Sequence, residues 1–321
     1  MSFTHKLLLG LMMIVFGSVG VRMYLQHTDV PQFVIETEVL SVLPPHHHDV
    51  HDSSMDEGHH MYLRSPIVYA PEDMWVREIE FELKNAHDTA LHHAVFMRLD
   101  KPNQVCPFIP MYDLLHVGED QMHDPSLKFA DGLGFFIPEG TPLLLDVMTH
   151  NPMPPLGPGE TYYDVSASIT LTLAREDEEL NPVRYYALHL ADRPCSLKSQ
   201  FTFAVPPRTE NFVFGANDTE VEQTAGRVTF TEDGAIVFMG GHIHGWEGGK
   251  YLDVYLNDEH LRRFETSKAS DDPYRYDTKF GNVHIPITAG DTISITSTYS
   301  NPHDHAIPGA MGMLGLFFAP D

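Results

Sequence analysis

The stretch M-G-G-H-I-H-G-W-E-G-G-K, from Met239 to Lys250, lies between two alternating apolar runs. The first run is Ala235–Phe238 and the second is Tyr251–Leu256. Alternation with a period of two is typical of a half-buried β-strand, and the flanking glycines allow the backbone to turn tightly. The stretch therefore predicts two strands joined by a glycine-rich loop.

Two histidines lie at the centre of this stretch, separated by one residue. Residues two apart in a strand project from the same face, so we expect His242 and His244 to point at one place while Ile243 turns inward. Such a pair is typical of half of a metal site. It is equally common on an ordinary solvated strand face, so its meaning depends on the rest of the chain.

Beyond Gln32 the chain repeats the alternating pattern and shows almost no sustained helical periodicity. Short apolar runs are separated by clusters rich in glycine and proline, a pattern that predicts all-β sandwiches or barrels. The expected strands include Trp75–Leu83, His92–Leu99, Leu143–Met148, Tyr162–Leu173, Gln200–Val205, Arg227–Thr231 and Thr292–Tyr299.

The length of 321 residues is enough for two domains that each bury a core. The clearest boundary is the charged run Arg175–Glu179, which Asn181-Pro182 follows. An acidic run beside a proline is typical of a solvated connection. We therefore expect two consecutive antiparallel β-sandwich domains of jelly-roll type, at 33–175 and 183–321, joined by a linker at 176–182.

The composition narrows the classes of partner. With 45 acidic against 20 basic residues, the formal net charge of -25 disfavours nucleic acid and anionic membrane surfaces. The chain contains 21 histidines and 15 methionines, whose imidazoles and thioethers suit copper. Chance composition is the alternative. The two cysteines, Cys106 and Cys195, allow a single disulfide.

The N-terminal residues 1–32 indicate export. The apolar run Leu7–Val21 has the length of a signal-peptide core and is short for a membrane span. Small residues, Ser18 and Gly20, offer a cleavage point, whereas Arg22 fits an uncleaved anchor, so both forms stay open. In either case we expect a periplasmic or extracellular location, where a disulfide could persist.

A segment at 44–61 is rich in histidine and methionine. Such a composition is found in flexible metal-collecting segments, and a polar loop with no preferred ion is the alternative. We do not expect catalysis there. The residues concerned are His46, His47, His48, His51, His59, His60, Met55 and Met61.

Further candidate metal ligands occur along the chain. His92 and His93 are adjacent in a strand, so joint binding requires a bulge or strand end, which Asp88-Thr89 could supply. His150 ends an apolar strand, and Met311 precedes the C-terminal one. Each of these residues, considered alone, is more often structural than functional.

Considered in order, they resemble the copper type II, ascorbate-dependent monooxygenase family, which includes the peptidylglycine-hydroxylating and dopamine-hydroxylating enzymes. The resemblance extends from about residue 61 to residue 320. It implies two copper ions facing each other across a cleft, one in each domain. The first would be held by His92, His93 and His150, and the second, where dioxygen and substrate meet, by His242, His244 and Met311.

The resemblance implies hydroxylation of a C–H bond with O2 and electrons from ascorbate or an electron-transfer protein. Met311 keeps the family's distance to the last strand, and Met313 is its main rival. Gly240 and Gly315 replace the arginine and tyrosine that hold a peptide carboxylate in the amidating branch. We therefore expect a small or apolar substrate in a roomier or more apolar pocket, and membrane contact only through the N-terminal segment.

Other histidines and other functions remain open. His303 and His305 precede Met311 and could be substrate-side contacts, alternative copper ligands or part of a solvated loop. A non-catalytic, exported copper-handling protein on the same scaffold is the alternative function, and an adhesive or scaffold β-sandwich with incidental histidines is a third. The following histidines have no positional argument and are expected in the surface or core: His116, His123, His189, His260 and His284.

Overall fold

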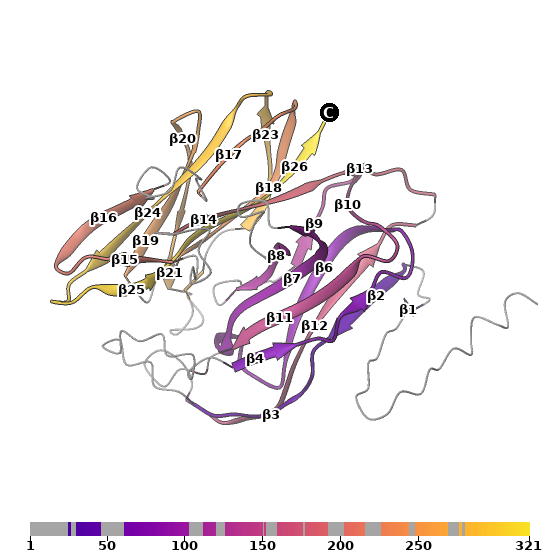
Figure 1. Ribbon diagram of the computed structural model, residues 1–321, viewed down its shortest axis with the longest axis horizontal. Coiled ribbons are helices and arrows are strands. Elements are labelled where there is room, and N and C mark those ends of the chain that lie inside the picture. Colours follow the sequence, from indigo (N-terminus) through magenta and orange to yellow (C-terminus); the bar gives the residue numbers. More distant parts are fainter. Residues whose placement is uncertain are drawn as a thin grey trace, which may run out of the picture.

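The prediction of an all-β fold is confirmed, because most described residues lie in antiparallel strands (Figure 1). The described residues also include one short 3-10 helix, η1 (Asp88–Ala90). None of the described segments forms an apolar helix of the length that a membrane span requires. The N-terminal segment, most of the His/Met-rich segment and both cysteines lie outside the described residues. The computed structural model describes residues 25–26, 30–45, 61–102, 112–119, 126–149, 151, 159–175, 177–191, 202–215, 226–243, 248–268, 276–277 and 280–321.

Two sheets form the N-terminal half of the molecule. The first has the order β1-β2-β12-β6-β10-β13, with β3 beside β12 and β9 beside β6. Its strands are β1 (Leu25–Gln26), β2 (Gln32–Glu36), β3 (Leu40–Leu43), β6 (Met74–Lys84), β9 (Ser126–Lys128), β10 (Leu133–Ile137), β12 (Tyr162–Leu173) and β13 (Asn181–Pro182). The second has the order β4-β11-β7-β8, with β5 beside β11. Its strands are β4 (Met61–Arg64), β5 (Val68–Tyr69), β7 (Leu91–Pro102), β8 (Tyr112–Glu119) and β11 (Pro142–Thr149).

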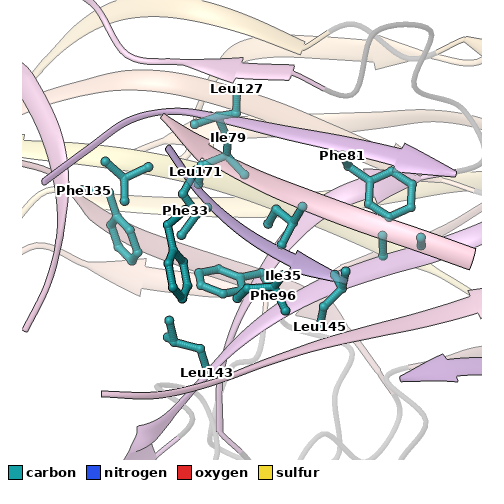
Figure 2. Close-up of a cluster of buried hydrophobic side chains, with 14 of the residues drawn as sticks. Phe33, Ile35, Ile79, Phe81, Phe96, Leu127, Phe135, Leu143, Leu145 and Leu171 are labelled. Carbon is teal, nitrogen blue, oxygen red and sulfur yellow. The ribbon is translucent and has the colours of Figure 1, made fainter. Parts of the chain in front are cut away.

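The alternation seen in the sequence puts every second side chain of these strands into a shared core. Phe33 and Ile79 from the first sheet lie over Phe96 and Leu145 from the second (Figure 2). Burying large apolar side chains on both inner faces drives the packing of the two sheets. This pair of sheets is the first sandwich.

The C-terminal half forms the second sandwich. Its four-stranded sheet has the order β14-β26-β18-β23, and its five-stranded sheet has the order β16-β24-β19-β20 with β17 beside β24. Small pairs, β15-β25 and β21-β22, flank them. The strands are β14 (Arg184–Leu190), β15 (Phe203–Val205), β16 (Thr209–Gly215), β17 (Arg227–Thr229), β18 (Gly234–Ile243), β19 (Gly249–Leu256), β20 (Glu259–Glu265), β21 (Ser267–Lys268), β22 (Tyr276–Asp277), β23 (Phe280–Ile287), β24 (Thr292–Asn301), β25 (Ile307–Ala310) and β26 (Gly312–Pro320).

The predicted linker is held against the first sandwich over its described part. The Asn181 amide donates to the Gly132 carbonyl at 2.8 Å, and β13 pairs in parallel with β10. Glu178 forms an ion pair with Arg77 at 3.0 Å. The connection is therefore fixed by backbone hydrogen bonds and an ion pair, in addition to being acidic as the sequence indicated.

The two sandwiches meet through the four-stranded sheet. Phe317 from β26 and Phe238 from β18 belong to the same apolar cluster as the core of the first sandwich. In Figure 1, β14 lies at this junction, close to β8. His93 on β7 and His242 on β18 both lie on strands that reach this junction.

Candidate metal centre

The histidine doublet lies at the start of β7, directly after η1. The side chain of His87 caps η1 by accepting from the Thr89 amide at 3.2 Å. The pairing of β7 with β11 then shifts, so that His93 is opposite Met148 and Leu91 is opposite Thr149. His92 is skipped in this register, so the strand has here an irregularity of the kind that joint binding by the two histidines would require. The bulge brings the rings of His92 and His93 to a centroid distance of 4.0 Å.

His242, the first histidine of the stretch Met239 to Lys250, lies near the end of β18. Strand β18 continues through both glycines to Ile243, which belongs to the core of the second sandwich as expected. Gly241 is required for this packing, because a Cβ there would lie 2.6 Å from the Phe264 ring. The alternation then turns His242 to the opposite face, toward the first sandwich.

The structure brings the two histidine groups together at the junction. The rings of His93 and His242 meet edge to face with their centroids 5.1 Å apart. All three rings are buried, with His92 3%, His93 9% and His242 0% exposed. Metal–nitrogen bonds of about 2 Å put two imidazoles of one tetrahedral ion about 5 Å apart between ring centres. The resemblance assigned these rings to two separate ions, whereas the observed distance is short enough for one ion to bind both.

The two candidate methionines occupy different positions beside His242. Met313 is the register partner of His242 in the β18–β26 pair and is 1% exposed. Met311 precedes β26 and is partly exposed, and its backbone amide and carbonyl both bind the Tyr299 hydroxyl. Directly paired residues project from the same face of a sheet, so Met313 is the methionine next to His242.

His189, which the sequence analysis left without a role, also belongs to this region. It is 4% exposed, and its register partner across β14–β26 is again Met313. The sequence indicates which face of its strand His189 lies on, because it stands between Leu188 and Leu190. Both leucines belong to the core of the second sandwich, so alternation puts His189 on the opposite face of the sheet. The pairing of β14 with β26, which gives that place its meaning, cannot be read from spacing.

Of the four remaining predicted histidine ligands, the structure describes two. His150 and His244 lie outside the described residues. His303 and His305 are described, and their rings stack on each other with centroids 5.3 Å apart. Their loop is organised by Asn301, which donates to the His305 carbonyl at 2.8 Å and accepts from the His303 amide at 2.9 Å.

The structure shows what lies against Gly315, whereas the expectation of a roomier or more apolar pocket stays a prediction. Gly315 pairs with Gly240 on the face that carries His242. This pair lies two residues from the His242–Met313 pair on both strands. A Cβ at Gly315 would lie 2.8 Å from the hydroxyl of Tyr185, which is buried. The side chain of Tyr185 therefore fills the space over Gly315, and the glycine is required by close packing.

The residues described so far provide an incomplete set of metal donors. Within the described ranges, no three or more side chains of His, Cys, Asp or Glu are arranged as a metal site. Methionine is not among those types, and two of the predicted histidine ligands lie outside these ranges. The donors that do converge are buried imidazoles beside a thioether, which is the chemistry that suits copper and, through sulfur, its reduced state.

Comparison of the sequence with protein-family models and with curated proteins finds no match. Among solved structures, PNGF-II is similar with a TM-score of 0.37 at 10% identity, over 90% of this chain and 65% of that one. The match thus spans less than two thirds of PNGF-II. Recombinant peptide:N-glycanase F has a TM-score of 0.36 at 8% identity, over 89% of this chain and 96% of that one. The major capsid protein P2 of bacteriophage PM2 has a TM-score of 0.32 at 7% identity, over 90% and 98%. These similarities are too weak to bear on the site or its chemistry.

Proposed function

We propose that this chain is an exported, copper-dependent monooxygenase whose copper is held where the two sandwiches meet. The observation that supports this proposal is the edge-to-face contact of His93 with His242, rings from different sandwiches, at a centroid distance of 5.1 Å. Copper bound there would supply one-electron redox chemistry and activation of O2, with electrons from ascorbate or an electron-transfer protein.

The residues of the chain provide orientation and exclusion of water. The bulge at His92 turns two adjacent imidazoles to the junction, and the alternation of β18 turns His242 toward them. Burial of these rings keeps bulk water away from the donors and strengthens the electrostatic interactions among them. The sandwiches are held in this arrangement by Phe317, which packs against Phe129.

The substrate is expected to be small or apolar. The apolar cluster around Phe317 and Phe238 lies on the same sheet face as His242. Neither Gly240 nor Gly315 provides a charged group that could hold a peptide carboxylate. Peptide C-termini are therefore not the proposed substrate class.

A non-catalytic copper-handling protein is the second candidate, and the burial of the rings favours it. An ion held among side chains that are 0% to 9% exposed is well placed for retention. The His/Met-rich segment at 44–61 would suit the collection of ions for such a protein. Storage, however, has no need for donors drawn from two sandwiches.

Oxygen consumption by the purified full-length chain separates the two candidates. The protein is loaded with copper and given ascorbate and oxygen with a panel of small apolar substrates. A monooxygenase consumes oxygen in a substrate-dependent manner, and both His93→Ala and His242→Ala abolish this consumption. His284→Ala, an exposed histidine on β23, is the matched control and retains it. Stable copper binding without turnover would favour the copper-handling protein, and absence of copper binding would contradict both.

A further inference from the structure

A row of three side chains crosses the four-stranded sheet of the second sandwich. His189 on β14 pairs with Met313 on β26, and Met313 pairs with His242 on β18. Directly paired residues of antiparallel strands have Cβ atoms about 4.5–5.5 Å apart on one face of the sheet. The two imidazoles therefore flank the thioether, one on each side.

The row faces the first sandwich, away from the core of the second. The sequence neighbours Leu188, Leu314 and Ile243 all belong to the second core, so alternation points the row to the other face. Four residues from Met313 on this face, Phe317 belongs to the cluster of the first core. Met313 is 1% exposed, so it is buried between its two register partners, His189 and His242.

We propose that His189, Met313 and His242 together bind the copper of the proposed centre as a single cuprous ion, with His93 of the first sandwich beside it. The outer Cβ atoms of the row are about 10 Å apart, twice the spacing of a cross-strand pair. Each imidazole with its metal bond of about 2 Å spans roughly half of that distance, so an ion over Met313 is reached from both sides. The inference rests on the proposed copper function and replaces Met311 with Met313 as the sulfur ligand.

The composition of the row selects the oxidation state. A soft thioether favours Cu(I), and neutral imidazoles accept either state of copper. The contact of His93 with His242 puts the first sandwich directly beside this row. An ion bound by the row would therefore lie at the junction between the sandwiches.

Cuprous-ion competition and X-ray absorption on the full-length chain test this assignment. A colour-forming cuprous chelator competes for Cu(I) under anaerobic conditions, and the absorption spectrum reports sulfur bound to copper. We expect Met313→Leu to weaken Cu(I) binding at least tenfold and to remove the sulfur signal. Met311→Leu, the matched control, keeps both. We expect His189→Ala to weaken binding similarly, whereas His284→Ala leaves it unchanged.

The outcomes separate this inference from the proposed function. Leucine has nearly the volume of methionine, so the variants are expected to fold, and circular dichroism of the copper-free proteins checks this. A sulfur signal lost in Met311→Leu and kept in Met313→Leu would overturn the row while copper binding stands. The same holds if His189→Ala binds Cu(I) as tightly as the unchanged chain. A chain that binds no copper would overturn both the row and the proposed function.

Discussion

Phe317, from the last strand of the second sandwich, packs edge to face against Phe129 of the first with their ring centroids 4.8 Å apart. Phe317 is 0% exposed and also contacts the rings of Phe135, Tyr185 and Phe238. These contacts hold the sandwiches in the arrangement that brings His93 to His242. The apolar junction is thus a precondition of the proposed copper centre.

Replacement of Phe317 by alanine should destabilise the junction. Loss of a fully buried phenylalanine leaves a cavity and is expected to cost about 3–5 kcal/mol. Urea unfolding of the copper-free chain measures this free energy. Val213→Thr, a change at an exposed position of β16, is the control and should stay within about 0.5 kcal/mol. A cost for Phe317→Ala as small as that of the control would show that the sandwiches do not depend on this ring.

The pair Gly315 and Tyr185 offers a test of the packing at the sheet face. Gly315→Ala should cost about 1–3 kcal/mol, because the new methyl group would lie 2.8 Å from the tyrosine hydroxyl. Tyr185→Phe removes that oxygen, so the double variant should recover part of the loss, with a coupling energy of about 1 kcal/mol. Strictly additive effects of the two changes on unfolding would mean that the hydroxyl does not occupy this space.

A buried carboxylate in the five-stranded sheet predicts a pH dependence of stability. Burial raises the pKa of the Asp253 carboxyl. Hydrogen bonds from Arg263 at 2.7 Å and from His260 at 2.9 Å together lower this pKa by more than burial raises it, so the net shift is downward. A carboxyl with a lowered folded-state pKa stabilises the fold fully above its unfolded value of about 3.9. This stabilisation is lost as the pH falls through the lower folded-state pKa.

Asp253→Asn should therefore lower the free energy of unfolding at pH 7 by about 2 kcal/mol, since it removes charge-assisted hydrogen bonds. The same variant should lose less stability than the unchanged chain between about pH 4 and about pH 2, because its amide does not titrate. This pH range extends about two units downward from the ordinary carboxyl pKa. Glu259→Gln, at an exposed position of β20, should change neither quantity. Urea unfolding across this pH range measures both, and parallel pH profiles for Asp253→Asn and the unchanged chain would refute the assignment.

Much of the fold could be predicted because alternation is a local property of the sequence. The run Tyr162–Leu173 is predicted and observed with the same bounds, as β12. The irregularity at His92 could be named from the sequence only as a condition for joint binding, since two adjacent histidines cannot share a face of a regular strand. The predicted runs Trp75–Leu83 and Thr292–Tyr299 lie in the same way within β6 and β24.

The candidate site could be predicted only in part, because it depends on pairings between distant strands. His242 and His93 are visible as motifs, but their contact is made by the docking of two sandwiches through Phe317. Met313 and His189 gain their role from the register of β26 with its two neighbours, which spacing alone does not define. Resemblance to a family favoured Met311, whose backbone the structure holds against Tyr299.

Copper-induced stabilisation in a double-mutant cycle tests most directly whether both sandwiches contribute to one copper centre. A bound ion raises the unfolding temperature by an amount that grows with the logarithm of its affinity, so the copper-induced rise is measured at one copper concentration for the unchanged chain, His93→Ala, His242→Ala and the double variant. If the two rings share an ion, each single variant loses most of the rise and the double variant loses little more. Single losses of about half that add up to the whole in the double variant would mean two independent ions, and would contradict a shared centre at the junction.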